Sequence, residues 1–248
     1  MSSNLLRLQD VVKQFGGFKA VDHMELTMGR GEVLGLVGPN GSGKTTCINI
    51  ISGLLRPDHG QVTLGEQDVT GWAPERLVHH GINRTFQLPK PFKSLTVAEN
   101  VAIARRYGKP QRPVEDPLAF VGLSDAAHRV AGQLNSAQQK LLDLARALAT
   151  GPDLLLVDEL AAGLTPAEME HIATKLLTLV DDGMSLLVVE HHMQFINRLT
   201  ERVIVMNLGR PIFEGSLAEA AHDPTVVEVY LGTSHVDPNI LLPQSPSP

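Results

Sequence analysis

The sequence predicts an α/β protein whose core is a parallel sheet covered on both faces by helices. Short apolar runs alternate with segments of helical periodicity in the second half of the chain, which is typical of strands joined by crossover helices. The run at 32–37 (EVLGLV) is apolar almost throughout and ends at a Gly-Pro-Asn-Gly turn. A strand buried on both faces has this composition, so we expect a buried parallel strand here.

The first half of the chain is expected to be rich in strands. The predicted strands are residues 5–12, 22–28, 32–37 and 60–65. Residues 44–55 carry apolar side chains at helical spacing directly after the glycine-rich turn. Thr96 and Glu99 have the Thr-x-x-Glu spacing of a capping box, so a helix is expected within 94–106.

The second half has a more regular pattern. The predicted elements are helix 137–149, strand 154–157, helix 166–180, strand 185–189 and strand 203–206. Proline and charged residues crowd 108–117, where we expect an exposed loop. The stretch 234–248 is rich in proline and serine, so it is expected to be disordered.

Composition and charge exclude several classes of protein. The 248 residues include 27 acidic and 21 basic side chains, for a net charge of −6, which argues against nucleic acid as a partner. Cys47 is the single cysteine, so a disulfide within the chain is impossible and a reducing compartment is expected. There is no apolar stretch of about 20 residues and no signal-peptide pattern at the N-terminus, which predicts no direct membrane insertion.

The strongest functional motif is the segment 38–45 (GPNGSGKT), which fits the phosphate-loop pattern G-x-x-x-x-G-K-[ST]. A strand is predicted before it and a helix after it, as the motif requires. Its glycines let successive backbone N–H groups face phosphate oxygens, Lys44 supplies a positive charge, and Thr45 offers a hydroxyl to Mg²⁺. We therefore expect a nucleoside triphosphate and Mg²⁺ to bind here. The predicted nucleotide-binding residues of the loop are Gly38, Pro39, Asn40, Gly41, Ser42, Gly43, Lys44, Thr45 and Thr46.

A second motif is the apolar run 154–157 (LLLV), which ends in the carboxylates Asp158 and Glu159. A buried strand that ends in two acids beside a phosphate loop suits metal binding and water activation. Asp158 is expected to hold Mg²⁺, and Glu159 to orient or deprotonate the water that attacks the terminal phosphate.

Further motifs follow in an order that resembles the ATP-binding cassette (ABC) ATPases, over about residues 5–232. Phe15 resembles the aromatic residue that stacks on adenine, and Gln87 the Q-loop glutamine that touches Mg²⁺ and the water. His191 matches the switch histidine, and 162–165 (AGLT) the D-loop. The segment 134–138 (LNSAQ) stands where the family has its L-S-G-G-Q signature.

This resemblance implies a P-loop NTPase (RecA-like) parallel-sheet core with an N-terminal antiparallel β subdomain and a small helical subdomain. The implied domain spans 5–232, with the core at 5–87 and 135–232, the helical subdomain at about 88–134 and a disordered tail at 233–248. The implied activity is transport-coupled ATP hydrolysis. The resemblance assigns catalytic roles to Glu159, His191 and Gln87, metal binding to Thr45, Gln87 and Asp158, and contact with a partner's ATP to Asn135, Ser136, Ala137 and Gln138.

Within the family, the chain is most similar to the ATPases of branched-chain amino acid importers. Four segments carry this likeness: 81–87 (GINRTFQ), 161–168 (AAGLTPAE), Glu190–His191 and 226–232 (VVEVYLG). The likeness implies a second ABC ATPase subunit (in a homodimer or heterodimer), two membrane permease subunits and an external solute-binding protein. It also implies a cytoplasmic location at the inner face of the cell membrane, reached through the permeases.

The sequence departs from the family pattern in three places. The signature has Asn135, Ser136 and Ala137 in place of Ser-Gly-Gly, Leu160 replaces a proline, and His192 replaces an aspartate. If the signature needs a glycine-only backbone angle, a Cβ at position 137 would cost about 1 kcal/mol. One interpretation is a heterodimer in which the ATP site served by this signature is slow. The other is drift with two working sites.

Two other family classes stay open. One is a soluble ABC ATPase of the iron–sulfur assembly type, and the other is an ATPase of an exporter or lipid transporter. DNA-repair members are excluded because the phosphate loop and the acidic strand are too close in sequence for a long coiled-coil insertion. Translation-factor members, which have two cassettes, are excluded because there is one phosphate loop.

Overall fold

Two sheets form the framework of the protein in this computed structural model, which describes residues 4–108 and 114–231. An antiparallel sheet has the order β2 (Phe18–Gly29), β1 (Asn4–Phe15), β4 (His59–Leu64), β5 (Gln67–Asp68). A mostly parallel sheet has the order β10 (Arg210–Ser216), β9 (Arg202–Asn207), β3 (Val33–Val37), β8 (Ser185–Val189), β7 (Leu154–Asp158), β6 (Ile82–Arg84). The predicted combination of a parallel core sheet and an N-terminal antiparallel sheet is thus confirmed.

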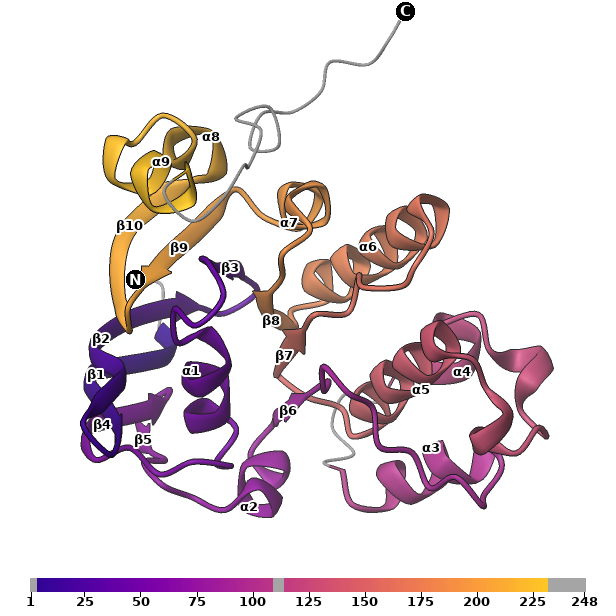
Figure 1. Ribbon diagram of the computed structural model, residues 1–248. Coiled ribbons are helices and arrows are strands. Elements are labelled where there is room, and N and C mark those ends of the chain that lie inside the picture. Colours follow the sequence, from indigo (N-terminus) through magenta and orange to yellow (C-terminus); the bar gives the residue numbers. More distant parts are fainter. Residues whose placement is uncertain (1–3, 109–113, 232–248) are drawn as a thin grey trace, which may run out of the picture.

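Helices connect the strands and cover both faces of the parallel sheet. They are α1 (Lys44–Ile51), α2 (Pro74–His79), α3 (Val97–Arg106), α4 (Pro117–Phe120), α5 (Ser136–Ala149), α6 (Pro166–Asp181), α7 (Met193–Leu199), α8 (Leu217–Ala220) and α9 (Pro224–Leu231), with the 3₁₀ turns Ser124–Ala126 and Ala131–Gln133. Helix α1 lies on the side of the antiparallel sheet, whereas α3, α4 and α5 gather at the opposite end of the molecule (Figure 1). None of the helices in the described part of the chain is long and apolar enough to cross a membrane.

The core strands are apolar on both faces because each face packs in a separate cluster. In β8, Leu186 and Val188 belong to the cluster that contains α5, α6 and α7. Their neighbours Leu187 and Val189 belong to the cluster that contains α1 and the antiparallel sheet. Successive side chains of a strand point to opposite faces, so a fully buried strand must be apolar at every position. This explains the apolar runs that predicted the sheet.

The predicted start of one helix is confirmed, and the predicted end of another is wrong. The Thr96 side chain accepts a hydrogen bond from the Glu99 N–H, and the Glu99 carboxylate accepts one from the Thr96 N–H, so the predicted capping box is confirmed. Helix α1 ends at Ile51, four residues earlier than predicted, because Gly53 adopts a positive φ of 75°. Strand β10 was not predicted; it is antiparallel to β9 and exposed or half-buried along its length, so it lacks an apolar run. The predicted tail 233–248 lies outside the described residues.

Candidate nucleotide-binding site

Four neighbouring strands of the parallel sheet bring the predicted functional residues to one edge. The phosphate loop follows β3, Gln87 follows β6, Glu159 follows β7 and His191 follows β8. The carboxyl ends of parallel strands meet at the same edge, where α/β proteins bind ligands. A cavity of about 300 Å³ opens there, lined by Phe18, Ala20, Asn40, Gly41, Gly43, Lys44, Thr45, Thr46, Gln87, Glu159 and His191.

Glycine is required in the phosphate loop at two positions. Gly38 has a φ of 148°, and a Cβ there would stand 2.2 Å from the backbone oxygen of Met206. Gly43 has a φ of 105°, and its Cβ would stand 2.2 Å from the backbone oxygen of Ala20. Any side chain would therefore push the loop away from its neighbours. The loop ends where α1 begins, so the positive end of the α1 dipole faces the cavity.

The ammonium group of Lys44 lies inside the curve of the phosphate loop. Its Nζ donates hydrogen bonds to the backbone oxygens of Gly38 (2.8 Å) and Pro39 (2.9 Å) and to Ser42 Oγ (3.3 Å). Burial lowers the pKa of Lys44, whereas the negative charges of Glu159 and Asp158 raise it. A buried cation that bonds only neutral oxygens of its own loop can exchange these partners for the oxygens of a phosphate.

Glu159 holds the two other predicted catalytic residues together. Its Oε2 accepts a hydrogen bond from Gln87 Nε2 (2.6 Å), and its Oε1 lies 3.1 Å from His191 Nε2. The backbone of Glu159 is left-handed, with a φ of 48°. All three side chains line the cavity that also contains Lys44. A carboxylate placed between an amide and an imidazole can orient a water molecule and accept its proton.

Asp158 is buried behind this group in an ion pair that the sequence did not reveal. Arg84 Nη2 donates to Asp158 Oδ2 at 2.7 Å, and Arg84 Nη1 donates to Asn49 Oδ1 (2.6 Å) and Ser52 Oγ (3.1 Å). The Asp158 N–H donates to Thr85 Oγ1. Burial raises the pKa of Asp158, while the positive charge of Arg84 lowers it. Arg84 therefore fixes the carboxylate that we expect to bind the metal.

Phe18, and not Phe15, is the aromatic residue that lines the cavity. The two residues are paired at the ends of the β1–β2 hairpin, and both rings are about half exposed. Phe18 shares a face of β2 with Ala20, which also lines the cavity, because residues two apart in a strand point the same way. Lys13 Nζ lies 5.6 Å from the centre of the Phe15 ring. Stacking of Phe15 on adenine stays a prediction.

The signature residues form an ordinary helix start. The Asn135 side chain accepts a hydrogen bond from the Gln138 N–H, and the Gln138 side chain accepts one from the Asn135 N–H. Ser136 and Ala137 are the first residues of α5, so their backbone is helical, and the condition under which a Cβ at Ala137 would cost energy, a glycine-only backbone angle, is not met. Among the residues that line the described cavity, none belongs to the signature.

Two charged residues behind the cavity were given no role in the site from the sequence. Glu190 is 2% exposed, and its Oε1 accepts a hydrogen bond from the Ala161 N–H at 2.7 Å. Burial raises the pKa of Glu190 to about 7, although the N–H groups of Ala161 and His191 and the charge of Lys140 lower it. Lys140, in α5, donates from Nζ to the backbone oxygen of Glu159 at 2.6 Å. Glu190 ends the apolar run 185–189 as Asp158 ends the run 154–157, so one rule could have found both.

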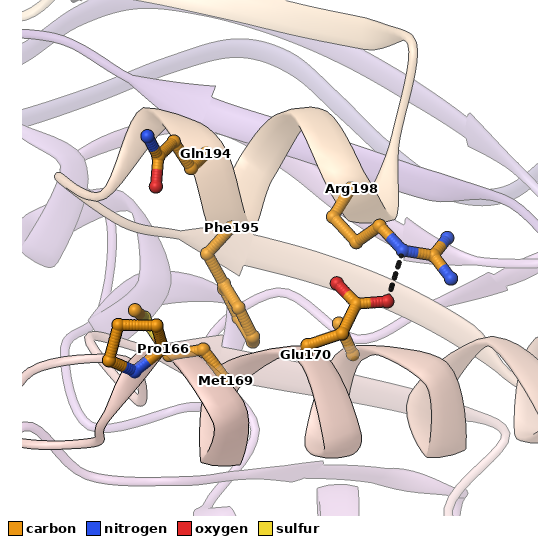
Figure 2. A pocket seen from close by; sticks show the side chains of 7 residues that line it. Pro166, Met169, Glu170, Gln194, Phe195 and Arg198 are labelled. Carbon is orange, nitrogen blue, oxygen red and sulfur yellow. Dashed lines mark hydrogen bonds and ion pairs between the residues drawn. The ribbon is translucent and has the colours of Figure 1, made fainter. Parts of the chain in front are cut away.

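A second, smaller hollow lies between α6 and α7 (Figure 2). It has a volume of about 80 Å³, and Arg198 Nε donates to Glu170 Oε1 across its rim at 2.9 Å. Pro166, Met169 and Phe195 form its apolar part. This hollow shares no lining residue with the phosphate-loop cavity, so it is not part of the candidate site.

The sequence of this chain is similar to a family profile and to curated relatives. A family profile described as ABC transporter matches residues 21–162. A probable branched-chain amino acid transport ATP-binding protein from Methanocaldococcus jannaschii is 36% identical over 250 residues, which cover 92% of this chain and 97% of the relative.

Solved structures of ATP-binding cassettes are similar to the fold of this chain. The ADP conformation of an ATP-binding cassette of an ABC transporter has a TM-score of 0.81 and 36% identity, covering 92% of this chain and 99% of that one. A dimeric cassette in a post-hydrolysis state, bound to ADP and Pi, has a TM-score of 0.77 and 27% identity, covering 85% of this chain and 98% of that one. Both likenesses agree with the predicted P-loop NTPase fold.

Proposed function

The chain belongs to the ABC transporter family, and from this premise we propose that it is the ATP-hydrolysing subunit of an importer for branched-chain or related amino acids. Hydrolysis of ATP follows from membership in the family and from its ADP-bound structural neighbours. The solute is proposed from the sequence relatives, which are transport proteins for branched-chain amino acids. The single observation that carries the activity is the contact of Glu159 with Gln87 and His191 in the cavity that contains Lys44.

We propose the following roles for the residues of the cavity. Lys44 and the N–H groups of the phosphate loop bind the phosphates of ATP. Gln87 and His191 orient the Glu159 carboxylate, which accepts a proton from the attacking water. The water oxygen bonds to the γ-phosphorus as the bond to the leaving ADP oxygen breaks, which yields ADP and phosphate.

The donor set at this site also fits Mg²⁺. Thr45 offers a hydroxyl, Gln87 an amide oxygen and Asp158 a carboxylate, and hard oxygen donors of this kind suit Mg²⁺. Arg84 donates a hydrogen bond to one oxygen of the Asp158 carboxylate, Oδ2. We propose that these three residues hold the ion, which would neutralise charge on the phosphates of ATP.

We further propose that two ATPase subunits bind nucleotide between them. The signature residues of α5 would contact the ATP of the partner, while the phosphate loop, Asp158, Glu159 and His191 of this chain serve its own ATP. The dimeric ADP-bound relative supports this arrangement. In a heterodimer with an altered signature, Glu159→Gln should abolish most turnover and the equivalent change in the partner should matter less. Equal losses would favour two working sites.

The permease partners are proposed to bind beside Gln87, at segment 90–99. Two large apolar side chains are exposed here: Phe92, within the segment, is 47% exposed, and Leu88, two residues before the segment begins, is 76% exposed. The amide N–H of Phe92 donates to Asn100 in α3, which fixes this segment against the helix. Such an exposed apolar patch is typical of a protein contact.

A pull-down from detergent-solubilised membranes tests the transport function. The tagged full chain should recover two multi-span permeases and a second ATPase subunit. A variant with Leu88→Asp and Phe92→Asp should lose them while it keeps ATP binding. Recovery of a soluble assembly scaffold in place of permeases would contradict an importer.

A further inference from the structure

Three residues, Glu159 to Ala161, form the segment that joins β7 to the D-loop, and their backbone is held at three points. The Glu159 N–H donates to the Val189 oxygen of β8 at 2.9 Å. The Glu159 oxygen accepts from Lys140 Nζ at 2.6 Å. The Ala161 N–H donates to Glu190 Oε1 at 2.7 Å. Two parts of the fold, helix α5 and the end of β8 with the residue that follows it, thus meet on this short segment.

The segment needs such support because Glu159 adopts a left-handed backbone. A residue with a Cβ adopts a φ of 48° at a cost, and it keeps this conformation only where its surroundings determine it. Leu160, which follows, is buried but has no ring that fixes its own φ. The contacts of Lys140 and Glu190 with this backbone therefore act together with the Glu159–Val189 hydrogen bond to hold the conformation from which the Glu159 side chain projects.

Lys140 joins this segment to the signature helix. It lies in the second turn of α5, directly after the capping box of Asn135 and Gln138. Leu141, Leu142 and Leu144 anchor the same part of the helix in the core. Because the helix is rigid, a shift of its first turn moves Lys140 Nζ and with it the Glu159 carbonyl. Its positive charge also attracts the buried carboxylate of Glu190.

We propose that Lys140 and Glu190 are positioning residues that clamp the backbone of residues 159–161, and that Lys140 transmits the position of the signature helix to Glu159. A cation holds a C=O at one end of the segment and a carboxyl oxygen holds an N–H at the other. The catalytic part of this inference rests on the proposed function of Glu159. The clamp itself is a property of the fold and can be tested without hydrolysis.

The first test is amide hydrogen exchange of the nucleotide-free full chain. A charge-assisted hydrogen bond that is lost should open the segment about ten- to a hundredfold more often. Lys140→Met and Glu190→Ala should each speed exchange in a peptide covering 158–163 by at least about tenfold. Lys140→Arg and Glu190→Gln, which keep a donor and an acceptor, should exchange like the wild type.

Lys175→Met is the matched control. Lys175 in α6 also donates from Nζ to backbone oxygens, those of Ala119 (3.1 Å) and Phe120 (2.5 Å), but away from the cavity. This variant should leave exchange at 158–163 unchanged. Equal exchange at 158–163 in Lys140→Met and Lys175→Met would overturn the clamp, and so would faster exchange spread evenly over the phosphate loop and the core.

The second test separates kcat from KM in ATP hydrolysis. Lys140→Met should lower kcat by at least about tenfold, leave KM for ATP and the affinity for a non-hydrolysable ATP analogue within about twofold, and be rescued by Lys140→Arg. An unchanged kcat together with faster exchange would overturn the transmission to Glu159. If the wild-type chain does not hydrolyse ATP, the proposed function fails, and the exchange experiment alone still decides whether the clamp exists.

Discussion

Glu190 should make the stability of this protein depend on pH, and Glu190→Gln should remove that dependence. The carboxyl group is 2% exposed, and its burial raises its pKa from 4.5 to about 7. A shift of this size corresponds to about 3 kcal/mol. Since the folded state holds the proton more tightly than the unfolded state, this stabilisation is complete below about pH 4.5 and is lost as the pH rises through about 7.

Glutamine keeps the oxygen that accepts from the Ala161 N–H but cannot ionise. The Glu190→Gln chain should therefore be more stable than the wild type by about 3 kcal/mol at pH 8, and by less than about 1 kcal/mol at pH 5. Urea unfolding at the two pH values, followed by circular dichroism, measures the difference in the free energy of unfolding. A difference that is the same at both pH values, or a less stable variant at pH 8, would refute the reasoning.

Three further predictions follow from buried or crowded positions. Cys47 is fully buried and its thiol pKa is raised to about 12, so a maleimide should label it at pH 7.5 only after denaturation, as mass spectrometry would show. Arg84→Met leaves the buried Asp158 without its cation and should lower the free energy of unfolding by about 3–5 kcal/mol, whereas Arg198→Met, at an exposed ion pair, should cost less than about 1 kcal/mol. Similar losses in a urea titration would contradict this. Gly38→Ala places a Cβ 2.2 Å from a backbone oxygen of β9 and should weaken ATP binding at least about tenfold in a fluorescent-nucleotide titration.

Motifs whose residues are close in sequence could be predicted from the sequence. The phosphate loop, the Thr96 capping box and the acidic end of β7 are defined within a few residues. The apolar runs of β7 and β8 are visible because both faces of those strands are buried. In each case the physical cause acts over one or two turns or one strand, so the sequence alone displays it.

Contacts between distant residues could not be predicted in this way. Arg84 and Asp158 are 74 residues apart, and Ala161 and Glu190 are 29 apart. Only the order of the strands brings them together, and a single sequence does not show which strands are neighbours. Glu190 had a visible signal, an acid at the end of an apolar run, whose meaning depends on the adjacency of β7 and β8.

The aromatic residue at the cavity was also not decided by the sequence. Phe15 and Phe18 are direct partners in the β1–β2 pair, so their side chains lie on the same face of the hairpin, and only Phe18 lines the cavity. The choice between them depends on how the hairpin packs beside the phosphate loop, which a single sequence does not show.

The most direct test of the account is the turnover of ATP by Glu159→Gln beside the wild type, with the affinity for ATP measured on the same samples. Glutamine preserves the size of the side chain but cannot accept a proton from water. The account predicts that kcat falls at least about a hundredfold while the affinity for ATP stays within about twofold. Hydrolysis at the wild-type rate would contradict the assignment of Glu159 as the residue that activates water in the cavity of Lys44.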